Sequence, residues 1–218
     1  MSNQLFDQNV NTMNHTQEYS DSEHEPSQSI QISSKRTRRM QYRLHSQLSH
    51  YRNEMKHYLV TTRFNNATWH ENTTYRAKHP TLGCVYPTPT ENSSQIRPDA
   101  IMFVLEMNNE TNRIMGIGMV KNHTIIKKHR VYSNENYNRY AYVGAHRIDR
   151  ADMTEEEEAV MCVFDVLCFT GARHMKRLQG IKAFPIDMLY KCSQVMDLVV
   201  YVRNMFKSRI TNTNTNTE

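Results

Sequence analysis

The chain has 218 residues, enough for one domain of ordinary size with tails, since a domain usually takes about 100 to 200 residues. Hydrophobic residues make up 38% of the chain, while only 6 Gly and 6 Pro argue against a many-turned sandwich or barrel, so mixed α and β structure is favoured. The formal net charge is +5, and no apolar run approaches the roughly 18 residues that cross a bilayer, so we expect no membrane partner.

Acidic residues are concentrated at the N-terminus. Five of the 22 acids fall within residues 1–34, which contain no Lys or Arg, leaving 17 acids against 27 basic residues elsewhere. The composition of 1–34 predicts a disordered acidic, polar tail. The basic remainder favours nucleic acid as a partner, the alternative being Lys and Arg that only solubilise the fold. Because no signal peptide is recognised, we expect an intracellular protein, in the cytoplasm or nucleus, or in a virion or infected host cell.

Residues 35–60 are predicted to form a basic helix, because they contain neither Pro nor Gly. Apolar residues at helical spacing would give it one buried side: Met40, Leu44, Leu48, Tyr51 and Met55. Such a helix could pack on the domain or lie on a polyanion. Residues 61–98 are polar and interrupted by proline, which predicts loops with short strands. They carry the single tryptophan, Trp69, for which both a core position and a pocket wall remain open.

Residues 100–121 predict a β-hairpin in a core. Phe103 and Leu105 alternate with Met102 and Val104, so both faces of the first strand are apolar and we expect both to be covered. The polar turn at 107–112 is rich in Asn, which tolerates left-handed backbone. Gly116 and Gly118 in the second strand indicate a bulge, or a place where a ligand or another backbone comes close.

A further strand is predicted at 140–148, with Tyr140, Tyr142 and Gly144 on one face. Core packing and base stacking are both open for the two tyrosines. Before this strand, Lys127 and Lys128 belong to a cationic cluster at 127–130.

The C-terminal third is predicted to be helical. Thr154 and Glu157 have the capping-box spacing, and Gly171 suits a left-handed helix end. A second long helix is expected from Pro185 to about Ser208, followed by a disordered tail at 211–218. The connection 171–184 carries basic residues around Gly180, which suits either a solvated turn or a phosphate site: Arg173, Lys176 and Arg177.

Signatures of catalysis are weak. The chain has no Gly-x-Ser-x-Gly elbow, no Walker loop, no dinucleotide-binding glycine fingerprint and no HExxH, and its four cysteines form no CxxC pair. We therefore predict no metal site and no cofactor. An enzyme acting on nucleic acid remains an alternative, with His129, His146 or His174 as acid or base.

The order of these features, a polar segment with Trp69, the strand IMFVLEM, the Gly-x-Gly run RIMGIGMVKN and the strand YAYVGAHRI, resembles the PUA-like superfamily, in particular its EVE and YTH type members. The Asn-rich composition also resembles uncharacterised proteins of large DNA viruses. The PUA-like resemblance implies a small mixed or antiparallel β-barrel with flanking helices, and a base or modified base in an aromatic-lined pocket. Trp69 is the only residue it suggests for an aromatic cage.

The sequence thus predicts an α+β domain at 61–210 that binds nucleic acid or a modified nucleotide without catalysis. Trp69, Tyr140 and Tyr142 would stack on a base, and Gly116 and Gly118 would admit the ligand. Basic residues expected to contact phosphate are Arg36, Arg38, Arg39, Lys127, Lys128, Arg173, Lys176 and Arg177. The first alternative is a structural or assembly protein, in a virus for example, that binds a protein partner.

Overall fold

A computed structural model of the chain describes residues 28–91, 95–125 and 129–215. The chain divides into two compact units, Met1–Leu44 and His45–Glu218, and the boundary falls inside the first helix, α1 (Gln28–Glu54). Of the tails expected at 1–34 and 211–218, residues 1–27 and 216–218 lie outside the described residues. Where they are described, at 28–34 and 211–215, the backbone is helical.

α1 ends six residues earlier than expected. It stops at Glu54, and the next segment, His57–Phe64, is a β-strand, β1. The run HYLVTTRF is rich in β-branched and aromatic residues, which favours a strand. The predicted helix was extended into this run because it contains neither Pro nor Gly. Of the expected apolar stripe, Tyr51 and Met55 pack against the core of the second unit.

The second unit is built on a mixed sheet. Its further elements are α2 (Asn66–Lys78), β2 (Cys84–Thr88), β3 (Ile101–Asn108), β4 (Arg113–Lys121), a 3-10 turn η1 (Glu135–Asn138), β5 (Tyr140–Gly144), β6 (His146–Asp149), a 3-10 turn η2 (Arg150–Asp152), α3 (Glu155–Phe169), β7 (Lys182–Ala183), α4 (Ile186–Ser193) and α5 (Leu198–Thr215). Five strands form one sheet in the order β6-β4-β3-β1-β7, and β2 pairs with β5 in a second sheet. β1 and β3 are parallel, and the other paired strands are antiparallel. The α+β class is confirmed, but the described strands do not close into a barrel.

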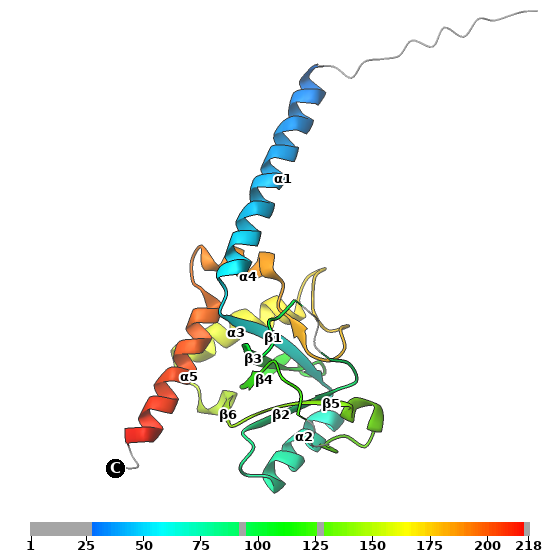
Figure 1. Cartoon of the computed structure of the whole chain (residues 1–218), viewed down its shortest axis with the longest axis vertical. Coiled ribbons are helices and arrows are strands. Elements are labelled where there is room, and N and C mark those ends of the chain that lie inside the picture. Colours follow the sequence, from blue (N-terminus) through cyan, green and yellow to red (C-terminus); the bar gives the residue numbers. More distant parts are fainter. Residues whose placement is uncertain (1–27, 92–94, 126–128, 216–218) are drawn as a thin grey trace, which may run out of the picture. The chain divides into compact units, whose positions relative to one another are not determined.

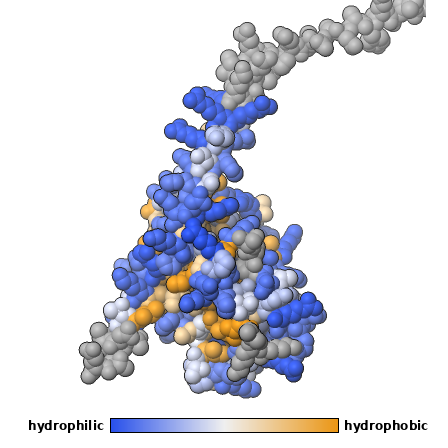
Figure 2. Space-filling model, viewed as in Figure 1, coloured by the Kyte–Doolittle hydropathy of each residue, from blue (hydrophilic) through white to orange (hydrophobic). Residues whose placement is uncertain are grey.

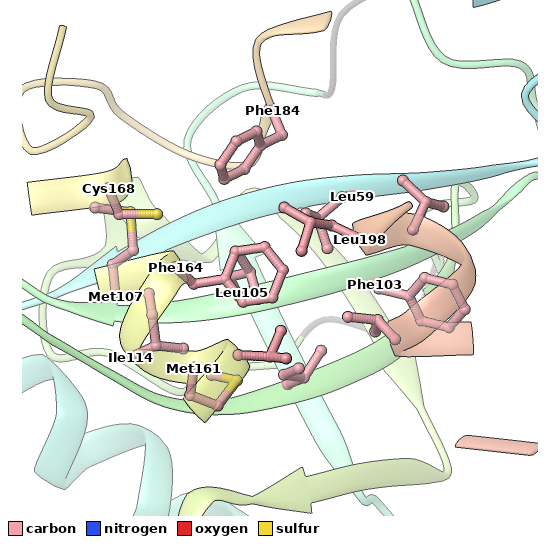
Figure 3. Close-up of a cluster of buried hydrophobic side chains, with 14 of the residues drawn as sticks. Leu59, Phe103, Leu105, Met107, Ile114, Met161, Phe164, Cys168, Phe184 and Leu198 are labelled. Atoms are coloured by element: carbon pink, nitrogen blue, oxygen red, sulfur yellow. The ribbon is translucent and has the colours of Figure 1, made fainter. Parts of the chain in front are cut away.

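The predicted hairpin is confirmed as β3 and β4, and both faces of β3 are covered. Phe103 and Leu105 face a core that contains α3, α4 and α5, whereas Met102 and Val104 face a second core with β2 and β5. Figure 1 shows this layering, with α3 and α5 on one side of the sheet and β2, β5 and α2 on the other. Figure 3 shows the larger core, in which side chains of β1, β3 and β4 meet those of α3 and α5.

The turn between β3 and β4 uses its asparagines as expected. Asn112 has a left-handed backbone, with φ of 52°. Asn108 accepts hydrogen bonds through Oδ1 from the backbone N–H groups of Glu110 (3.0 Å) and Thr111 (3.2 Å). These local bonds stabilise the turn. A contact from outside the hairpin adds to them, because Asn108 Nδ2 donates to Asn66 Oδ1 at 3.0 Å.

The strand predicted at 140–148 is split between the two sheets. β5 pairs with β2 and β6 pairs with β4, and only Ala145 separates them. The chain therefore passes from the small sheet to the large one at this point. The change of sheet depends on contacts with β2 and β4, so a single strand was the natural reading of the sequence alone.

The helix α2 was not predicted. Asn65 caps it, accepting a hydrogen bond from Thr68 N–H (2.8 Å) while the Thr68 hydroxyl accepts one from Asn65 N–H (3.0 Å). Only Asn72 is fully buried on it, and its Nδ2 donates to the Val85 carbonyl at 2.8 Å. A helix with so little apolar periodicity is stabilised mainly by these tertiary contacts.

The C-terminal helices follow their capping signals. α3 begins with the predicted capping box of Thr154 and Glu157, and Gly171 beyond its end has φ of 74°, as expected for a left-handed residue. The second predicted helix is broken into α4 and α5. Asp197 causes the restart, because its Oδ1 accepts hydrogen bonds from the backbone N–H groups of Val199 (2.9 Å) and Val200 (3.0 Å).

Replacing Thr154 with alanine is expected to lower the free energy of unfolding by about 1 kcal/mol, because the Glu157 N–H loses its cap. Urea denaturation followed by circular dichroism would measure the change. Glu156→Ala in the same turn is the control, since the Glu156 side chain is exposed and makes no hydrogen bond with any described residue. It should change stability by only a few tenths of a kcal/mol, and equal losses in the two variants would contradict the capping role.

Candidate functional site

The space beside the strand glycines is filled by the protein's own side chains. A Cβ on Gly118 would overlap the Tyr86 hydroxyl, and a Cβ on Gly116 would lie 2.6 Å from Arg147 Nη2 and 2.9 Å from Glu106 Oε2. These approaches correct the expectation that a ligand enters beside Gly116 and Gly118. The glycines instead make room for a buried polar group of residues.

That group centres on Glu106, whose side chain is fully buried on β3. Tyr86 Oη donates to Glu106 Oε1 at 2.7 Å, and Arg147 Nη2 donates to Oε2 at 2.7 Å. Arg147 continues the chain of contacts to Asp149, with Nη1 2.6 Å from Oδ2. The register of β3 and β4 shifts at Glu106, so the bulge that the glycines indicated is present.

The electrostatics show a closed network. Burial raises the pKa of Tyr86 well above its ordinary value, and the Glu106 charge adds to this. Burial alone would lower the pKa of Arg147, but the charge and hydrogen bonds of Glu106 and Asp149 raise it. Burial also raises the pKa of the neighbouring Cys84 thiol to about 12, so this thiol is not a reactive thiolate at neutral pH. Since each charge has a partner, we interpret the network as structural.

Trp69 lies on α2 and is enclosed by neighbours. Its ring meets Phe64 edge to face at 5.2 Å between ring centroids. The guanidinium carbons of Arg76 and Arg147 each lie 5.7 Å from the centroid of the Trp69 ring. Of the two alternatives left open for Trp69, packing within the fold fits these contacts.

The two predicted stacking tyrosines differ in exposure. Tyr142 is 2% exposed and pairs with Tyr86 across β2 and β5, whereas Tyr140 is 36% exposed at the start of β5. Tyr142 is therefore core and has no face for a ligand. Trp69, Tyr140 and Tyr142 do not converge on one cavity lined by the three of them.

The basic residues predicted to contact phosphate have different surroundings. Arg173 is paired with Asp187 through two hydrogen bonds, and Lys176 Nζ donates to Asn112 Oδ1 at 2.7 Å. Arg177 is exposed without a partner among the described residues. Lys127 and Lys128 lie outside the described residues. Of the three candidates in the connection 171–184, only Arg177 therefore offers a charge that no described residue engages.

α1 presents a different kind of basic surface. No Asp or Glu occurs in this helix before Glu54, and its described side chains from Arg36 to Leu44 are exposed. Arg36, Arg38 and Arg39, all predicted phosphate contacts, form no ion pair with any described residue. Arg36, Arg39 and Arg43 follow helical i, i+3, i+7 spacing and share one face. Figure 2 shows hydrophilic residues dominating α1 in that view.

A cavity of about 290 Å³ lies at the carboxyl ends of the parallel strands β1 and β3, beside the start of α2. Its lining residues are Thr62, Arg63, Phe64, Asn65, Thr68, Pro87, Pro89, Asn109, Tyr132, Tyr137, Leu178, Gln179 and Gly180. From the sequence, Gly180 was selected only as part of a basic loop, and Arg63, Tyr132 and Tyr137 were missed. An arginine within the strand-like run HYLVTTRF, which has no acidic residue, was the one signal that could have pointed to this place.

A second cavity, of about 330 Å³, lies between the end of α1 and the start of α5 within the second unit. Its lining carries charges of both signs, with Glu54 and Asp197 against Lys56 and Arg203. Because these charges can offset one another, this cavity gives no comparable indication of what it would bind.

Among the described residues, no group of three or more His, Cys, Asp or Glu side chains could hold a metal ion. His129, a candidate acid or base, lies 2.8 Å from Tyr75 Oη through Nδ1. No helix in the described ranges has the length and apolar character needed to cross a membrane. Comparison with known proteins gives no match for the chain among family models, curated proteins or solved structures.

Proposed function

We propose that the protein binds nucleic acid without catalysis, and that α1 supplies its electrostatic contact with the phosphate backbone. The observation that carries this proposal is the run of exposed arginines on α1, which has no acidic residue before Glu54. Uncompensated arginines attract polyanions and release their counterions on binding. The helical spacing of Arg36, Arg39 and Arg43 spreads charge over about 10 Å of one helix face, a length that several phosphates of a strand occupy.

The proposal includes a PUA-like domain as the base-reading part. The passage of one chain segment from β5 in the small sheet to β6 in the large sheet supports this finer assignment, since barrel-like folds turn corners in the same way. Lys127, Lys128 and Arg177 remain candidate phosphate contacts. Arg173 and Lys176 are weaker candidates because each already has a polar partner.

The triple variant Arg36→Gln, Arg39→Gln, Arg43→Gln is expected to weaken binding of a labelled oligonucleotide at least tenfold at low salt. Fluorescence anisotropy over a salt series would measure it, with single-stranded and duplex probes. The slope of log affinity against log salt should fall by about 0.7 to 0.9 for each phosphate contact that the substitutions remove.

The matched control replaces three arginines that already have carboxylate partners and are not candidate phosphate contacts: Arg113, Arg130 and Arg209. It lowers the net charge by the same amount, so a general charge effect would weaken both triple variants equally. Equal loss of affinity in the two triple variants would contradict the proposed role of α1. So would a wild-type affinity that does not change with salt concentration.

An apolar surface on α3 favours a protein partner as the second candidate. Val163 and Val166 are 46% and 59% exposed, and Cys162 beside them is also exposed. An assembly protein would bury such a face against another chain. Light scattering on the purified chain separates the two functions, because a defined oligomer that does not bind oligonucleotides would favour assembly.

A further inference from the structure

The cavity beside β1 has an unbalanced charge. Of the described residues that line it, Arg63 alone is charged, and no carboxylate lies in its wall. The other polar lining groups are hydroxyls and amides, for example Thr68, Asn109 and Gln179. An occupant with a negative charge would therefore meet one cation and no repelling acid.

Arg63 is held in place by oxygen atoms that carry no formal charge. Its Nε donates to the Met175 carbonyl at 2.7 Å, Nη1 to the Gly180 carbonyl at 3.0 Å, and Nη2 to the Thr61 hydroxyl at 2.7 Å. A weaker contact joins Nη1 to the Thr61 carbonyl at 3.5 Å. Since a guanidinium has five N–H donors, one hydrogen on Nη2 has no partner among the described residues.

Burial makes this charge costly. Burial lowers the pKa of Arg63 to about 10, and no carboxylate offsets the shift. Arg147 is the contrast within the same fold, because Glu106 and Asp149 raise its pKa despite similar burial. A buried cation without an anion is destabilising unless a ligand supplies the counter-charge. A guanidinium fork also suits phosphate and carboxylate oxygens better than a lysine does.

The rest of the wall suits a flat ring. Tyr132 and Tyr137 meet edge to face at 6.2 Å between centroids, and Tyr137 is 36% exposed. Pro87, Pro89 and Leu178 add apolar surface. An exposed tyrosine ring beside apolar walls offers a stacking platform for a planar ligand.

We propose that this cavity is a nucleotide-binding site in which the ring of the ligand stacks on Tyr137 and its anionic group pairs with Arg63. The preference for a planar anion stands on the cavity itself, whereas the choice of a nucleotide as that anion rests on the proposed nucleic-acid function. The same site could receive a free mononucleotide or one nucleotide of a strand.

Isothermal titration calorimetry on the full chain tests the proposal with adenosine, guanosine, cytidine and uridine 5′-monophosphates, the matching nucleosides, and a short oligonucleotide. At least one monophosphate should bind at least tenfold more tightly than its nucleoside. Affinity for the nucleoside that equals affinity for its monophosphate in all four pairs would overturn the pairing with Arg63.

Variants place the binding in the cavity. Leu178→Glu places a carboxylate in the cavity wall from a 46% exposed position, and its repulsion of the anionic group should abolish monophosphate binding. Tyr137→Leu should weaken binding about tenfold because the stacking surface is removed, whereas Tyr140→Leu, at the same 36% exposure outside the cavity, should change it less than twofold. Arg63→Met should remove the preference for the monophosphate, but it also releases Met175 and Gly180, so the other variants carry the test if it misfolds.

The two proposals fail separately. Oligonucleotide binding that depends on α1, together with no binding of any monophosphate, would overturn the cavity proposal and leave the function standing. Monophosphate binding that Leu178→Glu abolishes, together with no oligonucleotide binding, would support the cavity and overturn the nucleic-acid function. Monophosphate binding that survives Leu178→Glu would place the ligand elsewhere and overturn the cavity proposal.

Discussion

Replacing Gly118 with alanine is expected to lower the free energy of unfolding by about 3 kcal/mol, the upper end of the usual cost of overpacking, because the backbone or its neighbours must move. The added Cβ would overlap the Tyr86 hydroxyl and lie 2.7 Å from its ring carbon Cζ. Tyr86 cannot move aside without cost, since its ring is buried and its hydroxyl is bonded to Glu106 at 2.7 Å. Trp69, the only tryptophan, lies beside Arg147 of this network, so its fluorescence should report unfolding in urea.

Gly171→Ala is the matched control for Gly118→Ala. A Cβ at Gly171 meets nothing within 4 Å, although its φ of 74° makes alanine strained by about 1 kcal/mol. The loss of stability in Gly171→Ala therefore reports only backbone strain, whereas the loss in Gly118→Ala reports the overlap with Tyr86. Equal destabilisation by both substitutions would show that Tyr86 does not fill the space beside β4.

Replacing Arg147 with methionine is expected to cost about 3 to 5 kcal/mol, the usual result of removing one partner from a buried ion pair. Glu106 would lose its cationic partner in a fully buried position, with the Tyr86 hydroxyl as the remaining donor among the described residues. Arg113→Met is the control, because the Arg113 side chain is 55% exposed and pairs with Glu158 at the surface. That surface pair should contribute less than about 1 kcal/mol.

The double variant Glu106→Gln, Arg147→Met separates charge from packing. It removes the uncompensated charge, so it should be more stable than Arg147→Met alone, and a double-mutant cycle would give the coupling between the two side chains. No coupling between Glu106 and Arg147 would contradict the closed network. It would also reopen the region beside Gly116 as a site for an external ligand.

The parts of the fold that were predicted carry their signals within a few residues. The hairpin of β3 and β4 is set by alternating apolar residues and an Asn-rich turn, and α3 by Thr154, Glu157 and Gly171. The parts that were missed depend on partners far away in the sequence. α2 is stabilised by Asn72 on Val85 and by Trp69 on Phe64, and its own sequence has little helical periodicity.

The surroundings of the predicted ligand-binding residues could not be read from the sequence for the same kind of reason. Gly116 and Gly118 correctly indicated a bulge and a close approach, but a glycine does not say whether a ligand or a side chain makes the approach. Tyr140 and Tyr142 share a strand face in the sequence pattern, yet only the pairing of β5 with β2 decides that Tyr142 is buried. Arg63 was not singled out from the sequence, because only its neighbours in the folded structure show that it has no acidic partner.

By itself the sequence determined the class of secondary structure, the two-sided hairpin, the caps of α3 and the basic character of α1 before Glu54, because each depends on periodicity, capping or charge within one segment. Only the tertiary structure decided what fills the space beside the glycines and where a cavity with an unbalanced charge lies. Both depend on side chains that β1, β2, β3 and β6 bring together across the sheets, and a linear sequence contains no local signal for such distant contacts.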